Sequence, residues 1–305
     1  MDFLYKIYFG LSNFSWLGIF GKAINKILRL LIGIYIHSSM PIILSKESYN
    51  LNKEPRSKRI IFTLTSYPDR IESIWITIKT LFRQSYKADK IILYLSKIQF
   101  ENKNLPQSLI ELINMGLEVR WCDEDFKSHK KYFYAFQEFT NDYIITFDDD
   151  FFYPNNVVEN LINLNNNFSR AICATRVHKI TFGKKGNIKP YRKWKSNYVG
   201  KNYNNLFFTS GAGTLFSPNY FDQEIFNSDV FTKICLYADD VWLNIMALKS
   251  GIKVVSNKVF NKDAIVVKNS QYTSLVSSNV FESGNDKQIK EVIDYYKIIF
   301  QCQQN

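Results

Sequence analysis

The sequence predicts an α/β fold, a mostly parallel sheet flanked by helices, with an N-terminal helical appendage. From Ile60 onward, short apolar runs alternate with amphipathic segments, which is typical of strands connected by covering helices. Of the residues, 46% are hydrophobic and 16% aromatic, a composition that excludes a disordered chain. A length of 305 residues suits one large domain with an appendage. We therefore expect residues 1–58 to form an appendage and linker, and residues 59–305 to form one domain.

The appendage is apolar and basic. Residues 7–21 and 30–45 contain no Asp, Glu, Lys or Arg, but each stretch is shorter than the ~20 residues of a membrane-spanning helix. Lys22, Lys26 and Arg29 recur at the spacing of one helical face, beside a face of apolar residues. The segment is therefore expected either to lie on an anionic membrane as an interfacial helix or to pack on the core. A cleaved signal peptide is disfavoured because no small-x-small site follows the apolar run.

After a polar linker, the elements of the sheet domain follow in order. Buried-strand patterns predict strands at residues 60–65, 90–96, 117–122, 143–147, 171–175 and 253–255. Helical patterns predict helices at residues 71–82, 109–115, 130–139, 238–249 and 287–300, with another that opens at Pro154. Asp69 with Glu72 resembles a capping box for the first of these helices, and Gly116 is a left-handed stop for the second.

The net charge favours an anionic partner. Lys and Arg number 39 against 28 Asp and Glu, an excess of +11, which suits nucleotide phosphate, a lipid headgroup or nucleic acid. Residues 177–205 hold eight Lys or Arg, no acid and several aromatic rings. This segment could bind a phosphorylated or lipid-linked acceptor, or it could be a solvated surface loop. No segment resembles a named nucleic-acid module, so no nucleic-acid partner is expected.

Cysteine and histidine are too sparse to form a metal site of their own. The four cysteines lie far apart, without zinc-ligand or redox spacing, which favours structural thiols in a reducing compartment. The three histidines are His37, His129 and His178. Any metal would therefore be held mainly by carboxylates.

Asp148, Asp149 and Asp150 follow the predicted strand at residues 143–147. Adjacent carboxylates repel one another unless a cation or solvent compensates, and ligands of open α/β sheets bind at the carboxyl ends of strands. In extended backbone, Asp148 and Asp150 would share a face while Asp149 points elsewhere. The run predicts an oxygen-rich Mg²⁺ or Mn²⁺ site. The alternative is a solvated acidic turn.

A second acidic pair, Asp239 and Asp240, begins the predicted helix at residues 238–249. The pair could serve as an N-cap and a first-turn acid favoured by the helix dipole. A carboxylate beside a hydroxyl could instead take its proton as the oxygen attacks a substrate. Both interpretations remain open at this point.

Together these and further motifs resemble a known family. The chain looks like the GT-A glycosyltransferases related to inverting family 2, in particular the bacterial surface-polysaccharide enzymes of the capsule, O-antigen and lipooligosaccharide type. The resemblance covers residues 59–298 and is carried by the segments at residues 65–71, 91–96, 119–122, 128–131, 147–151, 178–182, 211–213, 238–243 and 284–288.

The resemblance implies a role for each matching residue. The residues that would bind the donor are Thr65, Ser66, Tyr67, Arg70, Lys130, Lys131, Asp148 and Asp149. The metal, Mn²⁺ or Mg²⁺, would be coordinated by Asp150 and Asp148, with Asp150 as the main ligand. Asp240 would act in catalysis as the general base, and Asp239 would orient the acceptor or the base. The residues expected on the acceptor side of the site are Gly211, Ala212, Gly213 and Trp242.

One departure from the family pattern concerns histidine. Many GT-A enzymes add a late His as a metal ligand, but no His follows His178 here. The diphosphate and water would have to complete the metal shell. His178 is expected to be a hydrogen-bonding loop residue.

By family resemblance, the implied function is the metal-dependent, inverting transfer of a sugar from a nucleotide-diphosphate donor, with a UDP-sugar favoured. The acceptor would be a glycan or a lipid-linked molecule, and the enzyme would be cytoplasmic, with peripheral membrane contact left open. A first rival is an Asp-x-Asp nucleotidyltransferase or phosphatase, although a phosphatase would place that motif early in the core, followed by Thr or Val rather than Phe151. A second rival is a basic membrane- or nucleic-acid-binding adaptor on an inactive fold.

Overall fold

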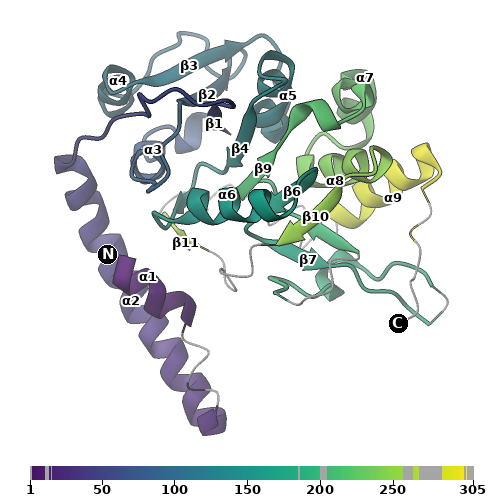
Figure 1. Cartoon of the computed structure of the whole chain (residues 1–305), viewed down its shortest axis with the longest axis horizontal. Helices are drawn as coiled ribbons and strands as arrows, with labels where there is room; N and C mark the ends of the chain where they lie inside the picture. The colour runs from purple at the N-terminus through teal and green to yellow at the C-terminus, as the bar shows by residue number, and fades with distance from the viewer. Residues whose placement is uncertain are drawn as a thin grey trace.

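A seven-stranded sheet forms the centre of the protein (Figure 1). The computed structural model describes residues 2–10, 14, 16–184, 186–199, 205–256, 264–267, 284–298 and 300. The strand order is β10-β6-β9-β4-β1-β2-β3. These strands are β1 (Ile60–Thr65), β2 (Lys90–Ser96), β3 (Leu117–Cys122), β4 (Tyr143–Phe147), β6 (Ala171–Ala174), β9 (Ala212–Phe216) and β10 (Lys253–Ser256).

The sheet is mostly parallel, as expected from the sequence. Strand β1 pairs in parallel with β2 and β4, β2 with β3, and β6 with β10. Strand β9 runs antiparallel to both β4 and β6. The first four predicted strands agree with the observed bounds. Apolar runs identify β1, β2 and β4, which are mostly buried, whereas β3 is an edge strand whose inner residues are half-buried.

Helices cover both faces of the sheet. Alternate residues of β1 enter different cores: Ile60, Phe62 and Leu64 join one cluster, and Ile61 joins the other. The first cluster includes buried residues of α3 (Ile74–Phe82), α4 (Gln107–Asn114) and α6 (Val157–Asn167). The second includes those of α5 (Lys130–Glu138), α7 (Ser228–Ile234), α8 (Asp239–Lys249) and α9 (Gly284–Tyr296).

Three predicted helices need correction at their ends. Helix α3 begins at Ile74 without the expected capping box, because Pro68 starts the short 3-10 helix η2 (Pro68–Arg70) ahead of it. Helix α6 begins at Val157 rather than at Pro154. Helix α9 spans Gly284–Tyr296, so it starts before Lys287 and ends before Phe300. The predicted stop at Gly116 is confirmed by its φ of +108°.

Short strand pairs complete the domain. Strand β5 (Phe151–Phe152) pairs with β11 (Ile265–Val266), and β7 (Val177–Lys179) pairs with β8 (Leu206–Phe208). Within the basic segment, Trp194 is buried, with its ring centroid 4.9 Å from that of Tyr191 and 5.1 Å from that of Phe207. These rings fill a local core. Lys185 and residues 200–204 of the segment lie outside the described residues.

The N-terminal appendage is a pair of helices, α1 (Asp2–Gly10) and α2 (Gly18–Lys46), that projects from the sheet domain (Figure 1). Helix α2 is continuous over 29 residues, and it joins the basic helical face at Lys22, Lys26 and Arg29 to the uncharged stretch at residues 30–45. By length and composition it could cross a membrane, with a mean hydropathy of 1.8 over its most apolar window. Its C-terminal half packs on the domain through Ile36, Met40 and Leu44.

Candidate active site

One edge of the sheet gathers the residues singled out in the sequence. The carboxyl ends of β1 and β4 meet at this edge because the two strands are parallel. Strand β9 runs the opposite way, so it begins there. The helices α5 and α8 begin with predicted site residues as well. The edge therefore brings together residues 65–67, 130–131, 148–150, 211–213 and 239–240.

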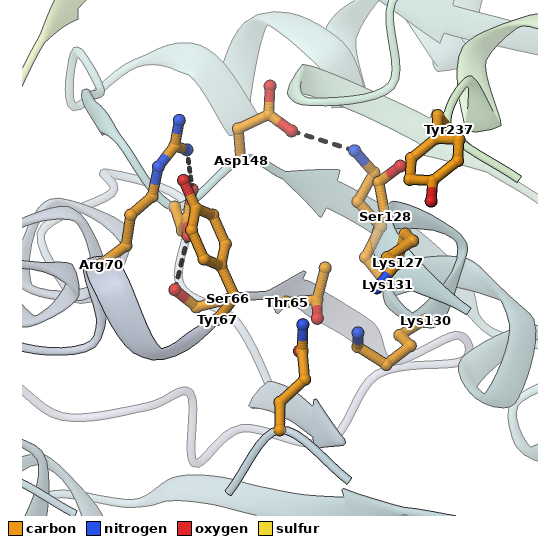
Figure 2. Close-up of a pocket in the computed structure, with 12 residues that line it drawn as sticks. Thr65, Ser66, Tyr67, Arg70, Lys127, Ser128, Lys130, Lys131, Asp148 and Tyr237 are labelled. Carbon is orange, nitrogen blue, oxygen red and sulfur yellow. Dashed lines mark hydrogen bonds and ion pairs between the residues drawn. The ribbon is translucent and has the colours of Figure 1, made fainter. Parts of the chain in front are cut away.

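A cavity of about 290 Å³ opens at this edge (Figure 2). Its lining contains all eight predicted donor-binding residues: Thr65, Ser66, Tyr67, Arg70, Lys130, Lys131, Asp148 and Asp149. Gln99, Lys127, Ser128 and Tyr237 complete the lining. Figure 2 shows Tyr67 and Arg70 on one side of the cavity and Lys130, Lys131 and Tyr237 on the other. Four cationic side chains thus surround a space with two carboxylates, which suits a diphosphate together with a cation.

Arg70 holds two of the three adjacent aspartates. Its Nη1 lies 2.5 Å from Asp149 Oδ1 and 3.2 Å from Asp150 Oδ2. Ser66 Oγ also donates to Asp149 Oδ2 at 2.5 Å. Burial and the charge of Asp149 nevertheless raise the pKa of Asp150 to about 7. The guanidinium therefore does not neutralise the whole run.

The three aspartates do not alternate as an extended strand would. Strand β4 has an irregular register at Thr146 and Phe147, and the chain bends at Asp149 and Asp150. Asp148 and Asp149 line the cavity, whereas Asp150 is buried behind them against Arg70. The expectation that Asp148 and Asp150 share one face and Asp149 points elsewhere is wrong for this conformation, because the β-geometry ends at Phe147.

Lys131 joins the two acidic runs. Its Nζ lies 2.9 Å from Asp148 Oδ1 and 3.0 Å from Asp239 Oδ2, and its side chain is 4% exposed. Burial alone would lower the pKa of Lys131, but Asp148, Asp239 and Asp240 hold it above its ordinary value. Lys131 therefore stays charged and keeps the runs together.

Ser210 holds both members of the second acidic pair. Its backbone N–H donates to Asp240 Oδ1 at 2.7 Å, and its hydroxyl donates to Asp239 Oδ2 at 2.8 Å. Burial would raise the pKa of Asp239, but Lys131 and other donors lower it to about 2. Burial and the charge of Asp239 raise the pKa of Asp240 to about 6. The pair thus contains one firmly ionised acid and one acid that exchanges protons near neutral pH.

Gly211 allows the close approach of Asp148. A Cβ at position 211 would lie 1.8 Å from the Asp148 carboxylate carbon, so a side chain there would displace it. The backbone N–H of Asp148 donates to Gly211 O at 2.8 Å, and Tyr153 Oη donates to the same oxygen. Ala212 begins β9, and Gly213 has a φ of +94°. Gly211 is therefore packed directly against the donor cavity.

Trp242 and the histidines do not line the cavity. Trp242, expected on the acceptor side, is fully buried, and its indole N–H donates to Ile225 O at 3.0 Å. No acceptor can touch this ring in the present conformation. His129 is buried between Tyr132 Oη and Cys235 O, and burial lowers its pKa to about 4. His178 accepts the Asn197 N–H at 3.3 Å, in agreement with the hydrogen-bonding role expected for it.

Some site residues were missed in the sequence. Ser210 and Tyr237 directly precede the motifs at residues 211–213 and 238–243, so inspection of motif neighbours would have found them. Ser128 is the first residue of the motif at residues 128–131 and Lys127 directly precedes it, although neither was assigned a role; both lie in the 3-10 helix η3 (Lys127–His129). Tyr153 and Gln99 carry no sequence signal, because their relevance arises from long-range contacts.

The donor groups fit a divalent cation. Among the described residues, no group of three His, Cys, Asp or Glu side chains is already arranged to hold a metal ion. The five acids at positions 148–150 and 239–240 nevertheless outnumber the nearby cations Arg70, Lys131 and Arg176. Burial and the neighbouring carboxylates together raise the pKa values of Asp150 and Asp240. An oxygen-ligated cation would neutralise the excess of negative charge.

Comparison with protein families identifies the chain. The family model described as glycosyl transferase family 2 matches residues 65–224, just over half of the chain. The protein belongs to glycosyl transferase family 2. This membership supports sugar transfer in general and confirms the expected GT-A fold. The matched range ends before Asp239 and Asp240, which the structure brings to the same edge through Lys131.

Solved structures with a similar fold include two proteins of different activity. A mannosyltransferase from Pyrobaculum calidifontis, in complex with GDP-Man and Mn²⁺, is 10% identical, with a TM-score of 0.47 over 88% of this chain and 75% of that chain. A 4-diphosphocytidyl-2C-methyl-D-erythritol synthase from Anaerococcus prevotii DSM 20548 is 13% identical, with a TM-score of 0.44 over 75% of this chain and 100% of that chain. No curated protein matches the chain.

Proposed function

We propose that the protein transfers a sugar from a nucleotide-diphosphate sugar to a glycan or lipid-linked acceptor, with inversion, in bacterial surface polysaccharide synthesis. The observation that carries this proposal is the bridge of Lys131 between Asp148 in the donor cavity and Asp239 beside Asp240. A donor bound in the cavity would lie next to a carboxylate that can accept a proton. Family membership favours sugar transfer over the phosphatase, nucleotidyltransferase and adaptor alternatives.

The donor is held by the residues that line the cavity. Tyr67 offers a ring for the base, and Thr65 and Ser66 lie beside it for the ribose. Arg70, Lys130 and Lys131 face the space that the diphosphate would occupy. We favour UDP over GDP as the nucleotide.

Asp150 and Asp148 would hold Mn²⁺ or Mg²⁺. Bound there, the cation would neutralise the charge that grows on the departing nucleoside diphosphate. Asp148 is 33% exposed and faces the cavity, whereas Asp150 is paired with Arg70. Arg70 would therefore have to share or release Asp150 for direct coordination, while keeping Asp149.

Asp240 would act as general base. Its carboxylate takes the proton of the acceptor hydroxyl while that oxygen bonds to the anomeric carbon and the bond to the diphosphate breaks. A single displacement of this kind inverts the anomeric configuration. Asp239 stays ionised beside Lys131 and orients the base, and residues 211–213 line the approach of the acceptor. We propose a cytoplasmic location, because the enzyme would use a nucleotide sugar, and no nucleic-acid partner is proposed.

The proposal is tested by release of nucleoside diphosphate from UDP- and GDP-sugars incubated with the purified protein and a panel of glycan acceptors. A chelator should abolish release, and Mn²⁺ or Mg²⁺ should restore it. Full activity in chelator would contradict the metal assignment. Absence of release from every donor by folded protein would contradict sugar transfer.

A further inference from the structure

Helix α2 presents a broad apolar surface that the rest of the described chain leaves uncovered. Phe20, Ile27 and Ile34 recur every seven residues, so they lie on one face, and their side chains are 80%, 56% and 53% exposed. Ile24, Leu30 and Leu31 are exposed around the same face, and Trp16, Leu17 and Ile19 are exposed near its start. Soluble proteins rarely expose a contiguous apolar area of this size without a partner.

The buried face of α2 lies on the opposite side. Ile32, Ile36, Met40 and Leu44 pack into the core cluster, together with Tyr5 and Phe9 of α1. Arg29 Nε donates to Tyr8 O at 3.3 Å, which fixes α1 against α2. The exposed face is therefore not the face that the fold uses, and the two helices form a supported arm whose outer surface is apolar.

The charges on the arm indicate which partner covers this surface. Lys22 and Lys26 are exposed toward the opposite side of α2 from Phe20, Ile27 and Ile34, where an interfacial helix carries its polar residues. From Phe3 to Lys46 the sequence contains no acidic residue. A second copy of the arm would bring like charges together, whereas an anionic lipid surface complements them. The exposed Trp16 and Tyr35 are residue types that favour the membrane interface.

We infer that the α1–α2 arm lies in the surface of an anionic lipid bilayer, with Phe20, Ile27 and Ile34 in the acyl region and Lys22 and Lys26 at the headgroups. The inference concerns a lipid partner and stands without the proposed activity. Because α2 rests on the domain through Ile36, Met40 and Leu44, the arm would lie along the surface rather than cross the bilayer.

Hydrogen bonds connect the base of the arm to β5 and β11, which lie next to the donor site. Tyr5 Oη donates to Phe152 O, and His37 Nε2 donates to Val266 O, both at 2.8 Å. The neighbouring Val267 N–H donates to Asp150 O at 2.7 Å. An arm on the bilayer would therefore hold the proposed metal-binding run close to the membrane. If the proposed function holds, this placement favours a lipid-linked acceptor over a soluble glycan.

The test is flotation of the full-length protein with vesicles of phosphatidylcholine containing phosphatidylglycerol, and with vesicles of phosphatidylcholine alone. The wild-type protein should float with the anionic vesicles. Substituting Phe20→Gln, Ile27→Gln and Ile34→Gln together should weaken binding at least ~100-fold, because three large apolar side chains no longer enter lipid. Lys22→Gln with Lys26→Gln should weaken it about fivefold per lysine, and only on anionic vesicles.

A matched variant carries Ile98→Gln, Leu248→Gln and Tyr295→Gln, at exposed apolar positions of the sheet domain. It should float like the wild type. No flotation of the wild type, or equal loss in both triple variants, would overturn the inference. A wild-type dimer in sedimentation velocity that the arm variant converts to monomer would assign the surface to a second copy instead. Nucleotide binding should be unchanged in the arm variant. A wild-type protein that binds lipid but no nucleotide would refute the proposed function and leave the membrane inference standing.

Discussion

The two acidic runs at the sheet edge are built from the same residue type, but the fold treats them differently. Asp149 and Asp150 share one guanidinium, that of Arg70. Asp239 and Asp240 have different partners, since Lys131 and the Ser210 hydroxyl contact Asp239 while the Ser210 N–H contacts Asp240. The shared partner gives a run suited to a cation, and the divided partners give one ionised acid beside one proton acceptor. Changes at the two runs should therefore alter different steps.

The largest expected effect is that of Asp240→Asn. Loss of the general base should lower kcat by about 1,000-fold or more, while nucleotide affinity stays near that of the wild type. Steady-state transfer kinetics and nucleotide titration measure the two quantities separately. Asp294→Asn, an exposed acid on α9, is the control and should leave both unchanged. Transfer that survives in Asp240→Asn would remove this residue from the role of base.

Gly211→Ala should affect the donor side. The added Cβ would overlap the Asp148 carboxylate, so that side chain must move away from Lys131. We expect kcat/KM to fall by about 100-fold, the usual cost of misplacing a reacting group by roughly 1 Å. Metal-dependent nucleotide affinity should fall with it.

Gly33→Ala provides the control for that substitution, because a Cβ at position 33 meets no atom within 4 Å. Its kinetics should match those of the wild type. If Gly211→Ala retained full nucleotide affinity with an unchanged melting temperature, the close packing of Gly211 on Asp148 would have no part in donor binding.

Ser210→Ala should act on the acceptor side alone. The variant removes the hydroxyl that donates to Asp239 but keeps the backbone N–H that donates to Asp240. A hydrogen bond to a charged group contributes about 1.5–3 kcal/mol, so kcat should fall by roughly 10- to 100-fold. Nucleotide affinity should not change, and Ser210→Thr, which keeps a hydroxyl, should recover part of the rate. A loss of nucleotide affinity without a loss of kcat would place Ser210 on the donor side instead.

The smallest expected effect is a shift in the pH profile. Asp240 must be ionised to accept a proton, and its pKa is raised to about 6, so kcat should fall as the pH drops through about 6. Asp239→Asn removes the neighbouring negative charge that raises this pKa. The acidic limb should then move to lower pH in a rate profile measured from pH 4 to 8. A limb that moves upward would contradict the coupling of the two acids.

The sequence predicted the parallel sheet because apolar runs such as residues 60–65 leave little alternative to buried strands. It did not predict β5 and β11, which have two residues each and therefore show no periodicity. The sequence also predicted, wrongly, that Asp148 and Asp150 share one face. The bend after Phe147 could not be predicted, because it depends on contacts with Gly211 and Tyr153 from other parts of the chain.

Similar limits applied to the rest of the site and to the arm. The motifs supplied Asp148 and Asp240, but their connection through Lys131 and Ser210 is a tertiary contact without a sequence pattern. The family resemblance placed Trp242 on the acceptor side with the rest of the motif at residues 238–243, yet helical geometry turns its side chain into the core. The spacing of Lys22, Lys26 and Arg29 predicted a helix in the appendage, but it did not show that α2 continues from Gly18 to Lys46, with Pro41 inside the helix.

The most direct test of the account is calorimetric titration of UDP, and then of GDP, into the protein with and without Mn²⁺, repeated on Asp150→Asn. Binding should require Mn²⁺, should be tighter for UDP than for GDP, and should be lost in Asp150→Asn. Failure of folded wild-type protein to bind either nucleotide, or metal-independent binding that Asp150→Asn leaves intact, would contradict the account.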